Sequence, residues 1–449
     1  MTLLQIIFAE VPGGLVMTGQ LLLSLSILVF VHELGHFLAA KAFGMRVDKF
    51  YVFFDFGGKK IFSITKGETE YGLGWFPLGG YVKIAGMIDE SMDKEQMNTE
   101  PQDWEFRSKP AWQRFIVMIG GVVMNVILGV IIYAFWLNQY QERYIPVAEM
   151  QEGVYAHELA RDLGFETGDR VVAVNGSTPE RYKDITPLKI YFGGEITVER
   201  DGEIKDVKIP GDLFKQIKEP LFSPLYEKVV VQRVFEGSNA EKGNLEVGDV
   251  IKGVDGKETT NFASFGELLR SHSGKSTTIA VNRGGELVTL NVDVPEEGKI
   301  GFESNVTTDT EKYPMKDYTW GSSLRYGSRE AFATFVTQVI GFGKLLRGKI
   351  PVRDSVQSPV GIATIFGSVW DWSKFWLLTA MISIVLAFMN ILPIPALDGG
   401  HIVFIGIEMI TGKPVSETVI EKAQVVGMVF LLTLMVLVVG NDILKLFGI

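Results

Sequence analysis

The sequence contains no cysteine, which excludes disulfide bonds and metal sites built on thiolates. It has only five histidines, so a metal centre would have to combine some of these with carboxylates. Basic tracts and basic residues interleaved with aromatics are also missing, and the net charge is −10, which argues against nucleic acid as a partner. No lysine or arginine precedes Lys41, so the basic region of a secretory signal peptide is absent. The first apolar run is therefore expected to remain in the protein as a membrane helix.

Long apolar runs decide the fold class. Hydrophobic residues make up 47% of the 449 residues and the mean hydropathy is +0.20, which predicts membrane and soluble parts in one chain. Four runs approach the length that a bilayer core requires, so we predict a multi-pass α-helical membrane protein with four transmembrane helices. These helices fall in residues 1–40, 115–137, 374–401 and 425–449, with loops at 41–114 and 402–424.

The stretch His32-Glu33-Leu34-Gly35-His36 lies near the end of the first apolar run. Two histidines four residues apart share one face of a helix, so both imidazoles can reach a single Zn²⁺. The adjacent Glu33 can hold and deprotonate a water, which is its part in metal-assisted peptide hydrolysis. Ionisable groups at membrane depth are costly, which favours a catalytic reading over packed histidines.

Basic residues predict how the chain crosses the membrane. The loop 41–114 is rich in lysine and arginine, whereas the N-terminal segment has none. The positive-inside rule places this loop in the cytoplasm and both termini outside. The first and third helices then both run from outside to inside, so polar motifs at their inner ends can meet.

The second polar motif follows the third apolar run and reads Asn390-Ile-Leu-Pro-Ile-Pro-Ala-Leu-Asp-Gly-Gly-His401. Its prolines stop the helix, and the backbone groups left unpaired are tolerated at membrane depth only where they are buried or line a wet cavity. Asp398 can lie level with the two histidines and supply a third zinc ligand. By spacing alone His401 competes with Asp398, and a simple helix cap and turn is the structural alternative.

The two motifs together resemble the site-2 protease family of intramembrane zinc metalloproteases. The resemblance implies that His32, His36 and Asp398 bind one zinc ion and that Glu33 is the catalytic acid and base. It also associates the asparagine and the two prolines of the second motif with substrate beside the metal. In this sequence those residues are Asn390, Pro393 and Pro395.

The residue pattern of the loop after the first helix predicts β-structure. Residues 60–65 and 69–73 flank Lys66-Gly67-Glu68, which predicts a hairpin with a three-residue turn. The next stretch is too apolar for a free loop, so we expect a membrane-associated sheet edge that pairs with an unwound substrate. The family has a similar re-entrant β element, and an ordinary surface hairpin is the alternative. The matching string is Gly79-Gly80-Tyr81-Val82.

An internal repeat occupies the region between the second and third helices. Residues 165–176 match residues 245–256, and residues 198–204 match residues 281–287. We predict two copies of a small β-rich domain, at 142–221 and 222–310. The repeated string resembles that of PDZ domains, which bind an extended peptide beside an exposed strand. In the first copy little apolar helix follows the string, which leaves its peptide groove in question.

Tandem PDZ-like domains resemble the bacterial branch of this family. That resemblance implies an inner-membrane enzyme with its PDZ-like domains on the periplasmic side and its active site toward the cytoplasm. The implied substrates are a membrane-anchored anti-sigma factor, cut after another protease, and remnant signal peptides. We expect residues 311–373 to form an amphipathic interfacial segment on the lipid bilayer, with its apolar cluster at Ala331–Leu346.

Other readings stay open at this stage. Asn125 in the second helix is expected to bond to a neighbouring helix, and direct contact with substrate or a metal-held water is the alternative. A non-enzymatic membrane receptor would explain the repeats but leave His32, Glu33 and His36 without a purpose. Metal transport would need a polar path through several helices, and only their inner ends are polar.

Overall fold

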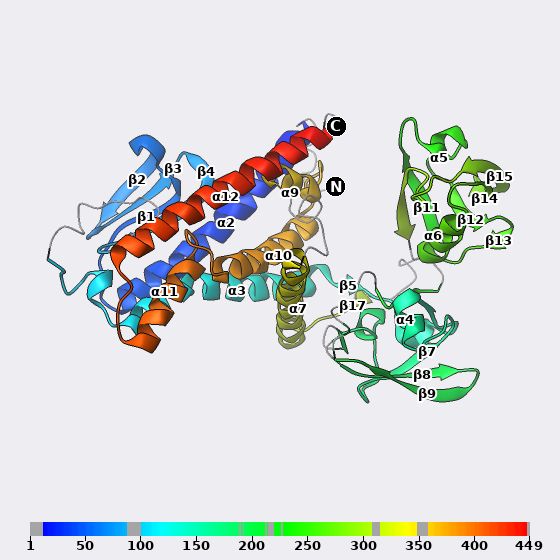
Figure 1. Ribbon diagram of the computed structural model, residues 1–449, viewed down its shortest axis with the longest axis horizontal. Coiled ribbons are helices and arrows are strands. Elements are labelled where there is room, and N and C mark those ends of the chain that lie inside the picture. The colour runs from blue at the N-terminus through cyan, green and yellow to red at the C-terminus, as the bar shows by residue number, and fades with distance from the viewer. Residues whose placement is uncertain are drawn as a thin grey trace. The chain divides into compact units, whose positions relative to one another are not determined.

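The computed structural model describes residues 12–87, 100–187, 190–191, 193–211, 213, 220–225, 228–307, 315–347 and 358–446. It divides into two compact units, one formed by residues 1–141 and 318–449 and the other by residues 142–317. The first unit holds the long helices and one sheet, and the second holds the remaining strands (Figure 1). The second unit is thus an insertion between two helices of the first.

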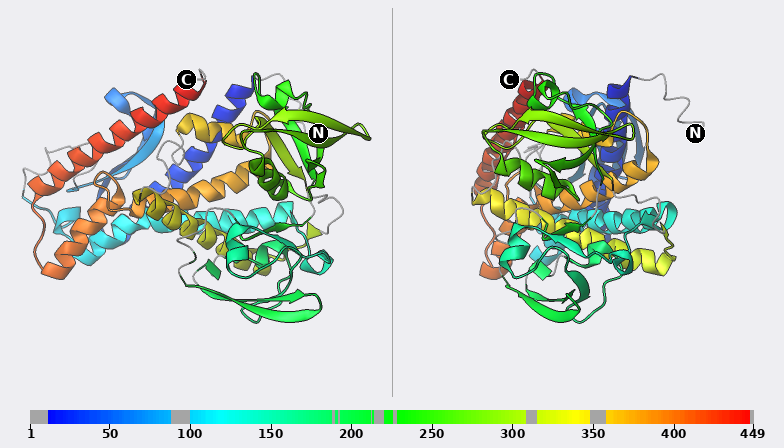
Figure 2. Two further views of the ribbon diagram at one scale, coloured as in Figure 1. Left: turned by 45° about the vertical axis from the view of Figure 1, so that its right-hand side comes forward. Right: turned by 90° about the vertical axis from the view of Figure 1, so that its right-hand side faces the viewer.

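Four described helices are long and apolar enough to cross a bilayer, as predicted: α2 (Gly13–Ala42), α3 (Ala111–Tyr140), α10 (Trp372–Ile391) and α12 (Glu417–Leu446). The second helix is longer at both ends than the predicted range, and the third ends at Ile391, before the prolines. Helix α3 is central in this unit, because α2 and α10 both pack against it (Figure 2).

Two further helices pack on α3. Helix α11 (Asp398–Thr411) begins at the predicted ligand, so much of the segment that we predicted as the loop 402–424 is helical. Helix α7 (Trp320–Leu346) begins eleven residues before the predicted apolar cluster, because Thr319 caps its amino end by accepting a hydrogen bond from the Ser322 amide. It is not among the candidate spans of the described chain, and its exposed and charged positions fit an interfacial helix. A short helix, α9 (Pro359–Phe366), precedes α10.

The sheet of the first unit has the strand order β2-β3-β1-β4, with β1 (Val47–Phe54), β2 (Lys60–Lys66), β3 (Thr69–Gly74) and β4 (Phe76–Ile84). Strands β2 and β3 form the predicted hairpin, but Lys66 pairs with Thr69, so the turn has two residues instead of three. Gly67 adopts a φ of 64° there, a conformation that glycine reaches without strain. Strand β4 lies at one end of this order, antiparallel to β1, and carries the Gly-Gly-Tyr-Val string.

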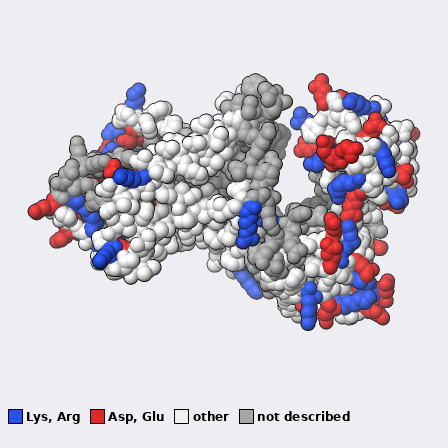
Figure 3. Space-filling view, viewed as in Figure 1, with Lys and Arg blue, Asp and Glu red and all other residues white. Residues whose placement is uncertain are grey.

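On the face shown in Figure 3, most charged side chains of the first unit gather at one end, and a further basic group lies over α7. Those at the end lie around the sheet and around the end of α11, whereas the helices between carry few. A continuous uncharged band is what a bilayer requires of the surface that it covers. The charge distribution therefore agrees with the assignment of the four spans.

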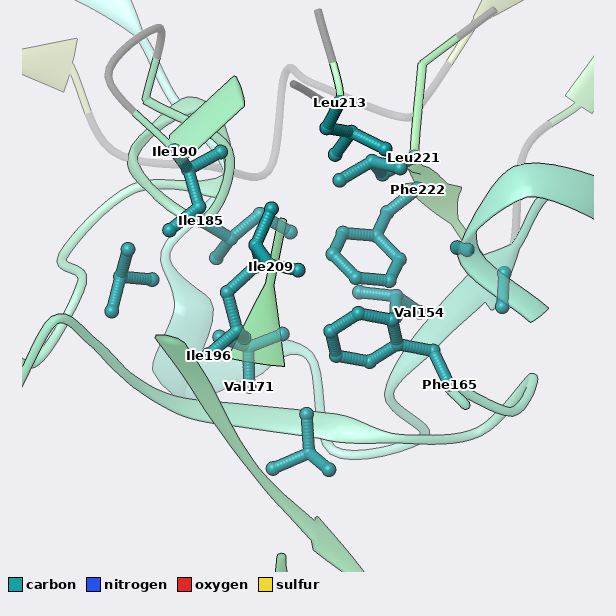
Figure 4. Packing of buried hydrophobic residues seen from close by; sticks show 14 residues of the cluster. Val154, Phe165, Val171, Ile185, Ile190, Ile196, Ile209, Leu213, Leu221 and Phe222 are labelled. Atoms are coloured by element: carbon teal, nitrogen blue, oxygen red, sulfur yellow. The ribbon is translucent and has the colours of Figure 1, made fainter. Parts of the chain in front are cut away.

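The second unit contains two β-rich domains, the first built on a cluster of buried aliphatic and aromatic residues (Figure 4). Phe165 and Phe222 meet edge to face in this cluster, with ring centroids 4.9 Å apart. Phe222 begins a strand that pairs with β6, so this domain extends beyond residue 221, where we placed its end. Its elements are β6 (Val154–Ala156), α4 (Glu158–Asp162), β7 (Arg170–Val174), β8 (Gly194–Arg200), β9 (Glu203–Ile209) and β10 (Phe222–Pro224).

The second domain has a larger sheet with the order β15-β14-β12-β11-β16, and β13 pairs with β12. Helices α5 and α6 contribute Ala240, Phe265 and Leu269 to its core. Its elements are β11 (Lys228–Val234), α5 (Asn239–Lys242), β12 (Val250–Val254), β13 (Lys257–Glu258), α6 (Phe262–Ser271), β14 (Ser276–Arg283), β15 (Glu286–Asp293) and β16 (Phe302–Thr307). Strands β5 (Glu142–Arg143) and β17 (Met315–Lys316) pair with each other at the two ends of the unit.

One ion-pair arrangement occurs in both domains. Arg200 donates from Nε and Nη2 to the two carboxylate oxygens of Asp169, at 2.7 and 2.8 Å. Arg283 makes the same pair of bonds to Asp249, at 2.8 and 2.7 Å. These residues occupy matching places in the two sequence repeats. The repeated contact therefore supports one ancestral domain present twice.

Candidate metal centre

Helix α2 carries the two histidines of the first motif on its buried face. His32 and His36 are 9% and 8% exposed, and their ring centroids are 4.9 Å apart. The helix can bury both rings because it crosses α3 at unusually short range. A Cβ on Gly35 would lie only 2.3 Å from the carbonyl oxygen of Gly120, so the crossing requires glycine.

A hydrogen bond fixes the tautomer of His36. Its Nδ1 lies 2.8 Å from the carbonyl oxygen of Val117 on α3, and a carbonyl can only accept. Nδ1 must therefore carry the proton, which leaves Nε2 with a free lone pair. This is the usual arrangement of a metal-binding imidazole and its supporting acceptor.

Asp398 meets both histidines from the first turn of α11. Its Oδ2 lies 3.0 Å from Nε2 of His32 and 3.4 Å from Nε2 of His36, and the two nitrogens are 3.2 Å apart. A tetrahedral zinc with ligands at about 2.0–2.1 Å holds them about 3.3 Å from one another. Asp398 Oδ2 is buried without a conventional hydrogen-bond partner, so a cation between the three atoms would satisfy it. These residues fit zinc, and they form a candidate metal group in the described chain.

Asn125 on α3 supports the other histidine. Its Nδ2 lies 3.2 Å from Nδ1 of His32, and its Oδ1 is buried without a partner. When Nε2 of His32 binds a metal, Nδ1 carries the proton and must donate it. A 180° turn of the amide brings Oδ1 to that position as the acceptor, which satisfies both atoms. Asn125 thus makes the predicted interhelical bond, and it makes it to a candidate ligand.

Strand β4 lies beside the motif glutamate. A Cβ on Gly80 would lie 2.6 Å from Cγ1 of Val29 and 3.4 Å from Cγ of Glu33, so the strand backbone touches α2 at this point. The backbone amide of Val82 is within hydrogen-bonding reach of the Glu33 carboxylate. The sheet therefore brings the predicted substrate-binding string to the face of α2 that carries the motif.

The second motif reaches the site from the end of α10. Nδ2 of Asn390 lies 3.3 Å from Nε2 of His32, so this predicted substrate-binding residue is next to the candidate ligands. Pro393 and Pro395 lie in the turn that joins α10 to α11. His401 points elsewhere, because its Nε2 lies 2.8 Å from Nε2 of Gln424 on α12. The geometry thus favours Asp398 over His401 as the third ligand.

Comparison with known proteins assigns the family. The sequence profile described as Peptidase family M50 matches residues 20–434, which is most of the chain. The chain belongs to peptidase family M50. It is a zinc metalloprotease of the membrane, and the resemblance to site-2 proteases is confirmed. Membership of this peptidase family argues against the alternative of a non-enzymatic membrane receptor.

Named relatives match this M50 peptidase along nearly their whole length. The "Regulator of sigma-E protease RseP" of Escherichia coli is 31% identical over 457 residues, covering 95% of this chain and 98% of the relative. The "Regulator of sigma E protease" of Haemophilus influenzae is 30% identical over 452 residues, with the same coverage. A protein of Neisseria meningitidis whose name describes it as a zinc metalloprotease is 28% identical, covering 94% of this chain and 97% of the relative.

Several residues that contact the candidate centre of this M50 peptidase cannot be identified from the sequence alone. Val117, Gly120 and Gly121 of α3 all contact the histidine motif or its helix, and Arg114 forms a largely buried ion pair with Glu408 that ties α11 to α3. The adjacent glycines in an apolar helix were the one available signal, because small residues mark close helix crossings in membranes. Which residue they would face could not be read from the sequence.

Proposed function

We propose that this M50 peptidase is an intramembrane endopeptidase that cleaves single-span membrane proteins within or near the bilayer. His32, His36 and Asp398 hold one zinc ion, and Glu33 is the catalytic acid and base. The convergence of three buried ligand atoms beside Glu33 carries this proposal. When bound, zinc acts as a Lewis acid toward the peptide carbonyl and lowers the pKa of water.

Glu33 supplies the proton transfers. Its carboxylate takes a proton from the water that attacks the scissile carbonyl and gives that proton to the nitrogen of the leaving amine. The nearby amide of Val82 can donate a hydrogen bond to this carboxylate. Asn125 and the Val117 carbonyl hold the imidazoles in the orientation that the ligands need.

Strand β4 offers a place for the substrate. It stands at the end of the described strand order, so one of its edges has no strand partner there. A substrate segment that unwinds can pair with Gly79, Gly80, Tyr81 and Val82 along this edge. Such pairing extends the peptide and presents its backbone to Glu33, since a helical segment hides its carbonyls from a nucleophile. Asn390, Pro393 and Pro395 would hold the same segment from the other side.

We further propose the cellular setting of the enzyme. Its spans lie in the bacterial inner membrane, with the metal centre toward the cytoplasm and two PDZ-like domains on the periplasmic side. The sigma-E regulator names of its relatives, together with the tandem repeat, support a membrane-anchored anti-sigma factor as substrate, cut for a second time during envelope stress. Remnant signal peptides are a second substrate class, because they too are short apolar helices.

Replacing Glu33 by glutamine tests the assignment of the base. The variant should bind zinc as the parent does, because Glu33 is not a ligand, while cleavage of a single-span substrate falls by about 10²–10⁴-fold or more. Zinc content and cleavage are measured on the same purified sample. Glu68→Gln in the exposed β2–β3 turn is the matched control and should keep full activity. Turnover retained by Glu33→Gln would exclude it as the base.

A further inference from the structure

Helix α12 touches the second motif at backbone distance. A Cβ placed on Gly427 would lie 1.8 Å from the carbonyl oxygen of Pro395 and 2.4 Å from its carbonyl carbon. No side chain fits in such a space, so the helix can approach the turn only because this residue is glycine. The contact joins the last membrane span to the segment between Asn390 and Asp398.

A second contact lies one turn away on the same face of α12. Gln424, three residues before Gly427, is 5% exposed and its Nε2 lies 2.8 Å from Nε2 of His401. Among the residues of α12 whose burial is described, Gln424 and Gly427 are the two buried ones. The neighbouring Val426, Val429 and Phe430 are each more than half exposed and suit a lipid surface. The two buried residues of α12 therefore both face the metal-bearing motif and the start of α11.

The turn that α12 touches is short and under strain. Ala396 adopts a φ of 77°, which is unfavourable for a residue with a Cβ and persists only where the surroundings hold it. The first turn of α11 packs back on this segment, since a Cβ on Gly399 would lie 1.9 Å from the carbonyl oxygen of Leu392. A displacement of Pro395 must therefore shift Asp398, which follows three residues later.

We propose that α12 positions the metal centre, through a clasp formed by Gly427 against Pro395 and by Gln424 with His401. The clasp holds the turn in the conformation that brings Asp398 to His32 and His36. His401 thereby gains a role that is neither metal binding nor catalysis. This inference rests on the proposed zinc site, and its test separates the two.

The first arm compares Gly427→Ala with Gly440→Ala. Both change the same residue type in the same helix, but a Cβ on Gly440 meets nothing within 4 Å. Alanine favours a helix over glycine, so a loss at position 427 cannot come from a weakened helix. We expect Gly427→Ala to raise the Kd for zinc at least tenfold, measured by chelator competition, while Gly440→Ala leaves it unchanged.

The second arm tests the hydrogen bond. Gln424→Leu removes it at similar volume and should raise the zinc Kd about tenfold, whereas Gln424→Glu still offers His401 a partner and should restore most of the affinity. Without zinc, Gly440→Ala, Gln424→Leu and Gln424→Glu should unfold at the same temperature, so a difference in zinc Kd among these three variants reports positioning and not general destabilisation.

His36→Ala removes a proposed zinc ligand and is the reference for a protein that cannot form the metal centre. If His36→Ala keeps its zinc, the proposed metal centre is wrong. If His36→Ala loses zinc while Gly427→Ala and Gln424→Leu bind it as tightly as Gly440→Ala, the metal centre stands and the clasp is refuted.

Discussion

Gly121 shows how closely the candidate centre depends on a residue that has no side chain. A Cβ at this position of α3 would lie 2.4 Å from Nε2 of His36 and 2.6 Å from Cε1 of His32. Both distances are far shorter than van der Waals contact. The two imidazole rings therefore pack directly against the backbone of α3 at Gly121. The imidazoles can keep these positions only if residue 121 has no side chain.

We predict that Gly121→Ala raises the zinc Kd by about 10–100-fold, because at least one imidazole must leave its position. Isothermal titration or chelator competition measures the change. Gly341→Ala in α7 is the matched control, since a Cβ there meets nothing within 4 Å. Equal zinc affinity in the two variants would show that the rings do not occupy the positions described.

At the scale of single residues, the sequence predicts those site residues whose chemistry requires a fixed spacing along the chain. His32, Glu33 and His36 follow from one helical turn, and Asp398 from a second motif at the same membrane depth. The choice between Asp398 and His401 could not be made from spacing, because it depends on the start of α11 and on Gln424 far along the chain. The contacts of Gly121 were out of reach because they depend on how α2 crosses α3.

Among the elements, β14 of the second β-rich domain is tied by Arg283 to the loop between α5 and β12, which carries Glu246 and Asp249. Burial raises the pKa of the Asp249 carboxyl, but bonds from the Arg283 guanidinium and the Glu246 amide outweigh it and hold the pKa below its ordinary value of 3.8. A carboxylate whose pKa is lowered by folding stabilises the fold above its unfolded pKa. That contribution is lost as the pH falls through the folded pKa.

Arg283→Ala should therefore destabilise this domain at neutral pH, because Asp249 stays buried and charged without its cation. Lowering the pH toward 4 should narrow the difference from the parent, since a protonated Asp249 no longer needs the guanidinium. Hydrogen exchange of the β14 and β15 amides in the full chain reports the stability locally. Lys252→Ala on the exposed side of β12 is the control. If the loss of stability caused by Arg283→Ala stays constant or grows as the pH is lowered, the assigned direction of the Asp249 pKa shift is wrong.

The elements themselves were predictable where the pattern is regular. The repeat at an offset of about 80 residues indicated two β-rich domains, and the apolar runs indicated four spans. Strand β1 was missed, because it follows the first span closely and its pairing with β3 and β4 is non-local. The end of the first domain was misplaced because β10 returns to pair with β6 at its beginning.

For the whole molecule, the second unit is an insertion whose ends meet. Arg143 and Met315 are paired Cα neighbours in the β5–β17 ladder, so the chain leaves and re-enters the unit at nearly one point. Residues 144–314 can accordingly be replaced by a short glycine-rich turn without stretching the flanking helices. None of the candidate zinc ligands lies in that range.

We predict that this deletion keeps zinc and cleavage but loosens substrate selection, because we expect the removed domains to act as a filter on the outer part of the substrate. The variant should cut single-span proteins with bulky outer domains that the intact enzyme rejects. Paired cleavage assays with short and bulky substrates measure the change. A folded, zinc-loaded variant that is inactive on every substrate would show instead that these domains deliver the substrate.

The zinc content of the purified protein tests the central claim most directly. The intact chain should carry one zinc ion, and Asp398→Asn should lose it because a ligand is removed. His401→Ala should keep most of its zinc, since His401 contacts Gln424 and is not a proposed ligand. Metal analysis after gel filtration in zinc-free buffer gives the comparison. A protein that loses zinc with His401→Ala and keeps it with Asp398→Asn would contradict the account.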